Sequence, residues 1–214
     1  MSLSRPVAAR VVPFATFIAF VALAPLVPAG AWWTVARDLC VAALLVAFRR
    51  EYVEILGAPR FSLREALAAA AVGMVVFLAW IASGWAMAPA HRGFDPGSEG
   101  GALFWPLAAI RLASIAITVP VMEELFWRSF LMRWIDRRDF LAMDPAAASL
   151  RAVVVCSALF AVEHSQWLAG LLAGLAYAAI YVRTRNILLS ILAHAITNAT
   201  LGLWILATGE WRFW

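Results

Sequence analysis

The sequence predicts an all-α fold: a polytopic integral membrane helical bundle of about seven transmembrane helices, seven or eight in number. Hydrophobic residues make up 64% of the 214 residues and charged residues only 14%, whereas a soluble domain is about half apolar and roughly a quarter charged. The apolar runs are continuous over about 20 residues, the length with which a helix crosses a bilayer. They lack the alternation that is typical of barrel strands. Helices therefore satisfy the backbone in lipid.

The predicted spans follow one another through short connections. The fifth span is short for a full crossing, and only Ser165 and Gln166 separate it from the sixth, so we expect these two to form a tight helical hairpin. The whole chain, residues 1–214, is expected to form a single transmembrane domain. In chain order the spans cover residues 11–27, 32–48, 67–87, 105–126, 152–164, 167–182 and 187–207.

The arginines predict the orientation of the bundle. All 17 basic residues are arginines, and most lie in every second connection, whereas the other connections hold little more than Arg92 and Arg212. Cytoplasmic loops carry the excess of positive charge, so the N-terminus is predicted to be cytoplasmic and the C-terminus to lie outside. This placement favours the lipid bilayer as a partner and argues against nucleic acid. The basic connections hold Arg5 and Arg10; Arg49, Arg50, Arg60 and Arg64; Arg133, Arg137, Arg138 and Arg151; and Arg183 and Arg185.

Two adjacent glutamates lie at the end of the fourth span. Glu124 and Arg128 are spaced i, i+4, so they share a helix face and can pair. Glu123 is rotated about 100° from Glu124 and points elsewhere without a neutralising partner. Pro120 precedes the pair, and a proline inside a span frees a carbonyl and kinks the helix. Taken alone, the group also fits an interfacial charge cluster.

Two further patterns place polar groups inside apolar helices. His164 follows Phe160 by four residues at the far end of the fifth span, and His194 and Asn198 share one face of the seventh. Each pattern alone fits a packing residue or a helix-to-helix polar contact. Ionisable groups at membrane depth are costly, however, at about 2.5–3.5 kcal/mol on insertion scales. Such residues on three separate helices indicate a common site.

Together these residues have the composition of a hydrolytic site. Glu123 is expected to take a proton from water as general base, and His164 is expected to orient that water. His194 and Asn198 are expected to donate to a common point and to stabilise the oxyanion of a tetrahedral intermediate.

The depth of Glu123 is a consistency check. If Arg128 marked the membrane boundary, Glu123 would lie only about 8 Å inside it. If the helix continues to Asp136, the depth becomes about 20 Å, comparable with that of His164 from Arg151. We therefore predict that Arg128 is not the membrane boundary.

The three patterns resemble the motifs EExxxR, FxxxH and HxxxN, which occur in this order in the type II CAAX prenyl endopeptidases and their bacterial relatives, the CPBP or Abi intramembrane proteases. Glu123–Arg128, Phe160–His164 and His194–Asn198 match all three. The resemblance covers residues 120–198, which would form the catalytic core; residues 1–100 carry no such signature.

The resemblance implies an intramembrane endopeptidase of the glutamic type, which needs no cofactor and acts on a peptide or a membrane-protein segment. It places catalytic roles on Glu123, His164, His194 and Asn198. Glu124, Arg128 and Phe160 would orient the site or hold the substrate. The arginine- and alanine-rich composition favours a multi-pass protein of the inner (plasma) membrane of a bacterium.

Two alternatives stay open. A zinc-dependent version of the protease would use His164, His194 and a glutamate as ligands, since three such ligands plus water suit a catalytic zinc site. A non-catalytic membrane scaffold or immunity protein of the same fold would keep the residues without turnover.

Overall fold

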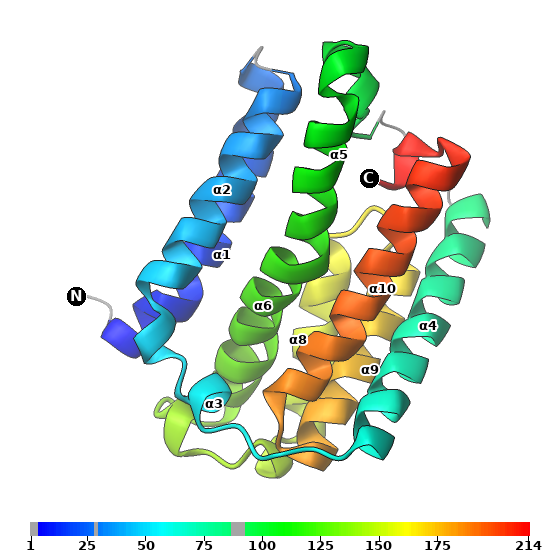
Figure 1. The fold of residues 1–214 in the computed structure, drawn as a ribbon. Coiled ribbons are helices and arrows are strands. Elements are labelled where there is room, and N and C mark those ends of the chain that lie inside the picture. Colours follow the sequence, from blue (N-terminus) through cyan, green and yellow to red (C-terminus); the bar gives the residue numbers. More distant parts are fainter. Residues whose placement is uncertain (1–3, 28–29, 87–92) are drawn as a thin grey trace.

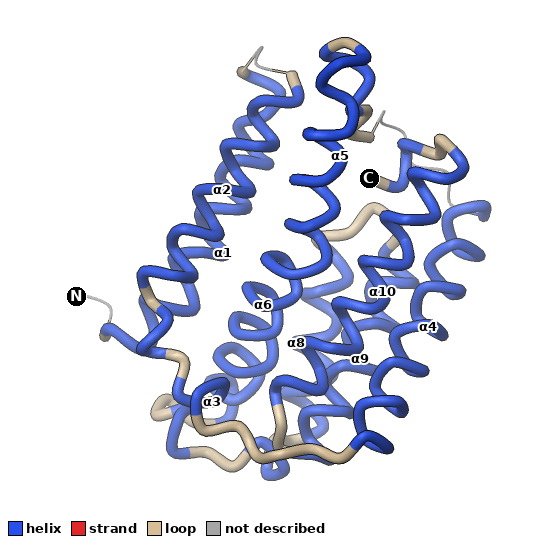
Figure 2. Tube along the Cα trace, in the orientation of Figure 1, coloured by secondary structure: helices blue, strands red, loops and turns tan. Residues whose placement is uncertain are grey.

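The computed structural model describes residues 4–27, 30–86 and 93–214; Arg92 lies outside them. Within these ranges the regular structure is entirely helical (Figures 1 and 2). The predicted all-α class is therefore confirmed.

Among the described residues, five helices are long and apolar enough to cross a membrane, and the chain is a multi-pass membrane protein. They are Arg5–Leu26, Leu63–Gly84, Gly101–Asp136, Trp167–Thr184 and Ile187–Thr208. Two of the seven predicted spans are shorter than these. Helix α8 (Leu150–Val162) is an apolar helix of 13 residues, and α2 (Ala31–Ala47) has 17 residues, with Arg37 and Asp38 buried in it. The count of seven and the cytoplasmic N-terminus stay predictions.

The helices form two groups with one long helix between them (Figure 1). Helices α1 (Arg5–Leu23) and α2 pack together on one side. On the other side α4 (Leu63–Ala86), α9 (Trp167–Thr184) and α10 (Ile187–Thr208) pack against one another, and α8 packs on α9. Gly73 makes the contact of α4 with α10 possible, because a Cβ there would lie 2.4 Å from the carbonyl oxygen of Ala193.

The long central helix runs without a break through α5 (Phe104–Ala113), the π-helical segment η5 (Ser114–Thr118), α6 (Val119–Glu123), the π-helical segment η6 (Glu124–Met132) and α7 (Arg133–Asp136). The helix continues for eight residues beyond Arg128, whose side chain is 1% exposed. The helix thus extends past Arg128 as the predicted depth of Glu123 requires, and the position of the membrane boundary stays a prediction.

The turn between α8 and α9 lies inside the bundle. Helix α8 ends at Val162 and α9 begins at Trp167, as the predicted tight hairpin requires. Gln166 in the turn is 3% exposed, and its side-chain oxygen accepts a hydrogen bond of 3.3 Å from the Ser83 hydroxyl of α4. This bond ties the turn to a neighbouring helix and holds the end of α8 within the bundle.

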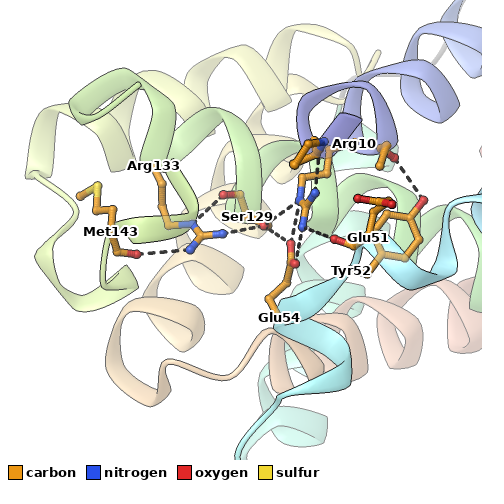
Figure 3. A network of polar contacts seen from close by, with 9 residues as sticks. Arg10, Glu51, Tyr52, Glu54, Ser129, Arg133 and Met143 are labelled. Carbon is orange, nitrogen blue, oxygen red and sulfur yellow. Dashed lines mark hydrogen bonds and ion pairs between the residues drawn. The ribbon is translucent and has the colours of Figure 1, made fainter. Parts of the chain in front are cut away.

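A buried polar network joins α1 to the central helix (Figure 3). We call Arg10, Glu54, Ser129 and Arg133 the brace. Arg10 pairs with Glu54, which lies on the short helix α3 (Val53–Leu56), and the Ser129 hydroxyl donates to the same carboxylate. The Arg133 guanidinium donates to the Ser129 hydroxyl at 2.7 Å and to the Met143 carbonyl at 3.2 Å. The brace thus fixes the central helix one turn beyond Glu124 and Arg128.

Candidate active site

The three sequence motifs meet in one place. Glu123, Glu124 and Arg128 lie where α6 passes into η6, His164 follows the end of α8, and His194 lies on α10. Glu123, His164 and His194 all line one cavity of about 250 Å³.

Glu124 is the most buried member of the group, with no exposed side-chain surface. Its Oε1 lies 2.9 Å from Nδ1 of His194 and 3.2 Å from Nη1 of Arg128, so the expected i, i+4 pair forms. A carboxylate only accepts hydrogen bonds, and Nδ1 of His194 therefore carries a hydrogen. Glu124 thereby fixes the orientation of the His194 ring.

Glu123 has a different environment. It lines the cavity, whereas Glu124 lies behind it. Its Oε2 is 3.8 Å from Nε2 of His194 and, among the described residues, has no hydrogen-bond partner although it is buried. The two glutamates point apart, as expected from their positions on the helix, but the His194 ring lies between them and approaches both.

Glu163 and His164 complete the cavity opposite Glu123. The Trp127 indole N–H donates to Oε1 of Glu163 at 3.0 Å. Nδ1 of His164 donates to the Phe160 carbonyl at 2.7 Å, because a carbonyl can only accept, and this leaves Nε2 of His164 as an acceptor. Ligand atoms of Glu123, Glu163 and His164 all lie within 4.8 Å of one another.

The sequence analysis assigned no role to Glu163. Consecutive residues of a helix point about 100° apart, so an adjacent glutamate and histidine would not be expected to reach the same cavity. Helix α8 ends at Val162, however, and Glu163 is its C-cap. The end of the helix changes the backbone direction and brings both side chains to the site. The available signal was a second carboxylate beside His164 in an apolar setting.

Asn198 uses one of its two amide hydrogens inside the bundle. Its amide donates at 2.9 Å to the carbonyl of Ile115, a residue of the π-helical segment η5. In π register this carbonyl would accept from residue 120, but Pro120 has no N–H. Asn198 supplies the missing donor and still lines the cavity.

Aromatic rings enclose the charged groups. The Phe160 ring lies 4.3 Å from the Arg128 guanidinium carbon, and the Tyr177 ring stacks on His194 with centroids 4.8 Å apart. The Tyr177 hydroxyl is held by Thr197 at 2.7 Å. These rings exclude water from the Glu124–Arg128 pair, and an electrostatic interaction is stronger in such surroundings.

The residues present also fit a divalent metal, with a ligand set that differs from the expected one. The zinc alternative named His164, His194 and a glutamate; Nδ1 of His194 is bonded to Glu124, so Nε2 is its remaining ligand atom, and this set stays a prediction. The compact donor set is Glu123, Glu163 and His164. Two carboxylates and one imidazole are ligands that zinc accepts in catalytic sites.

Comparison with known proteins gives one match. Residues 104–200 match the model of the family described as type II CAAX prenyl endopeptidase Rce1-like. No curated protein matches the chain, and no solved structure does. The matched segment contains Glu123, Glu124, Arg128, His164, His194 and Asn198, and thus all three motifs. The resemblance read from those motifs is therefore confirmed by the family model over residues 104–200.

Proposed function

We propose that this protein is an intramembrane endopeptidase in which Glu123 activates the attacking water. One observation carries the proposal: Glu123 lines a cavity together with Glu163 and His164, and its buried Oε2 has no hydrogen-bond partner among the described residues. Buried polar atoms are almost always bonded. An unpartnered carboxylate oxygen facing a cavity is the arrangement that a general base needs before its water binds.

The reaction follows from the positions of the donors and acceptors. A water between Glu123, Glu163 and His164 gives its proton to Glu123, and its oxygen attacks the peptide carbonyl. The tetrahedral intermediate collapses when the C–N bond breaks, and Glu123 returns the proton to the leaving amine. The products are a carboxylic acid and an amine.

The oxyanion requires donors on the opposite side of the carbonyl. Asn198 uses one amide hydrogen for Ile115 and has a second one free, since a side-chain amide carries two. His194 adds an Nε2–H donor in its protonated form. Glu124 and Arg128 act as positioning residues, because they hold the His194 ring, and Phe160 covers that pair.

We propose that the substrate is a membrane-associated peptide, because residues 104–200 match the model of a protease family. The site lies inside helices that are apolar enough to cross a bilayer, so a substrate segment must tolerate that depth. We further propose seven spans, a cytoplasmic N-terminus and the plasma membrane of a bacterium as the location. Labelling single cysteines placed in the arginine-rich connections from each side of the membrane tests this topology.

The decisive experiment compares membranes that contain the wild-type protein with membranes that contain Glu123→Gln. We expect uncleaved precursors to accumulate with the variant, because loss of a general base typically costs about 10²–10⁴ in rate, while the unfolding midpoint stays unchanged. Asp139→Asn, a matched change at an exposed loop carboxylate, is the control. Cleavage that continues at the wild-type rate in Glu123→Gln would reject Glu123 as the general base, and a phenotype that ignores the change would favour a non-catalytic scaffold.

A zinc-dependent version is a second candidate, and the Glu123, Glu163 and His164 cluster favours it. A bound zinc ion supplies Lewis acidity and makes water more acidic. Purified protein assayed with and without a chelator, together with its metal content, separates the two versions. Full activity after chelation of a metal-free preparation excludes the zinc version.

A further inference from the structure

A second group of charges lies inside the bundle, on the other side of the site from the brace. Asp38 of α2 accepts from Arg37 at 2.8 and 2.9 Å, both on Oδ1. Its other oxygen, Oδ2, lies 3.5 Å from Nη1 of Arg111 on α5. These three residues have a formal charge of +1, and Asp95, a further carboxylate on the wall of the cavity that Arg37 and Arg111 line, is bonded to the backbone N–H of Gly97.

Arg111 connects this group to the candidate active site. It lines the 250 Å³ cavity that holds Glu123 and His164, and it also lines a second cavity of about 450 Å³ that Arg37 lines. Trp214 is likewise shared by the two cavities. These two residues therefore lie where the two cavities adjoin.

Both shared residues have a donor that nothing in the described part of the chain accepts. Nε of Arg111 and Nε1 of Trp214 are buried without a hydrogen-bond partner, and arginine and tryptophan side-chain nitrogens only donate. A buried donor without an acceptor destabilises the fold unless a ligand accepts its hydrogen. Two such donors on the walls of the cavity that Arg37 also lines are complementary to a bound anion.

We propose that Arg111 and Trp214 bind a carboxylate of the peptide substrate, with Arg37 and Asp38 holding Arg111 in place. This inference rests on the proposed function, because it names a recognition element of the same substrate. Guanidinium and carboxylate form strong charge-assisted hydrogen bonds, and the Trp214 N–H can donate to the same carboxylate.

The spacing along the central helix gives the position of that carboxylate. Arg111 precedes Glu123 by twelve residues of continuous helix, which is roughly 18 Å at 1.5 Å per residue. An extended peptide covers about 3.3–3.6 Å per residue. Because both side chains line the same cavity, this spacing is an upper limit, and the carboxylate is expected within about five residues of the scissile bond, either at the free C-terminus or on an acidic side chain.

The test measures binding rather than cleavage, so that it does not depend on turnover. Full-length Glu123→Gln protein in vesicles of neutral phosphatidylcholine is titrated with fluorescein-labelled apolar decapeptides. These carry a free C-terminal carboxylate, a C-terminal amide, or an amide with one internal aspartate. We expect one of the two acidic peptides to bind about tenfold more tightly than the neutral amide. Which of them does so identifies the source of the carboxylate.

Two further substitutions test which residues cause the tighter binding of the acidic peptide. Adding Arg111→Gln is expected to abolish the tenfold ratio, and adding Trp214→Phe, which keeps an aromatic ring but removes the N–H, to reduce it. Arg49→Gln, at an exposed arginine, and Trp105→Phe, at a tryptophan that is 71% exposed, are matched controls that should leave the ratio unchanged. Unfolding midpoints show which variants are folded.

Equal affinity for all three peptides would overturn the inference, as would a ratio that survives both Arg111→Gln and Trp214→Phe. A loss of the preference when phosphatidylglycerol replaces part of the neutral lipid would assign the site to an anionic lipid and would also overturn it. An intact preference in a protein that never cleaves peptides would leave this inference standing and reject the proposed function.

Discussion

The brace and the candidate active site are both buried charge clusters, and the residues that they contribute to the central helix lie about one turn apart. No buried side-chain nitrogen or oxygen of Arg10, Glu54, Ser129 or Arg133 lacks a hydrogen-bond partner, whereas Oε2 of Glu123, Oε2 of Glu124 and Nη1 of Arg128 have no such bond among the described residues. Arg128 still lies within ion-pair distance of Glu124.

This difference indicates that the brace stabilises the fold and that the candidate active site is built to react. A buried ion pair with all its atoms bonded holds elements together, whereas unbonded polar atoms cost free energy and persist where a ligand or a reaction requires them. The brace therefore supports the position of the central helix, and the site uses that position. Four changes can break or sharpen this contrast.

The largest effect on stability is expected from the brace. Arg10→Met leaves the Glu54 carboxylate buried without its cation, and removing one partner of a buried pair costs about 3–5 kcal/mol. The free energy of unfolding, measured by denaturant titration in detergent, should fall by that amount. The double variant Arg10→Met/Glu54→Leu should recover much of the loss, because no unpaired charge remains. A loss in the double variant larger than in Arg10→Met would contradict the assignment.

Glu124→Gln is expected to affect both properties. Arg128 loses its carboxylate, so the unfolding free energy should fall by roughly 3 kcal/mol. His194 loses a charge-assisted hydrogen bond, so cleavage should slow by about one to two powers of ten. Glu123→Gln, measured in parallel, should lose activity alone. If the two variants behave alike, the division between a positioning and a catalytic glutamate is wrong.

A smaller effect is expected where Asn198 replaces a missing backbone donor. Asn198→Ala leaves the Ile115 carbonyl without its partner, and Pro120→Ala restores a backbone N–H in the same helix. In a double-mutant cycle, Asn198→Ala should therefore cost about 1 kcal/mol less in the Pro120→Ala background. If the two changes in unfolding free energy are additive, the Asn198 amide does not replace the N–H that Pro120 lacks.

The smallest effect is expected at an exposed pair remote from both clusters. The Ala146 backbone N–H and the Arg185 guanidinium hold the pKa of Asp144 below its usual range. A carboxyl whose pKa is lower in the folded state stabilises the fold above its ordinary pKa, and this contribution disappears as the pH falls through the lowered value. The difference in unfolding midpoint between wild type and Asp144→Asn should therefore be small at neutral pH and vanish in acid. A difference that grows as the pH falls would contradict the lowered pKa of Asp144 in the folded state.

The long apolar runs determined an all-helical membrane protein, because backbone groups in lipid have few other ways to be satisfied. The i, i+4 spacing determined that Glu124 pairs with Arg128, and the chain order of three short motifs indicated the family. These features are local, so the sequence carries them directly.

Only the tertiary structure decided what depends on contacts between distant residues. His194 reaches Glu124 across 70 positions and Asn198 reaches Ile115 across 83, so neither partner could be inferred from spacing. Glu163 enters the cavity because α8 ends just before it. A role for the buried charges of Arg37, Asp38 and Arg111 can be inferred only from the cavities beside them. Helix packing determines which polar groups meet, and periodicity in one helix carries no information about the face that its neighbour presents.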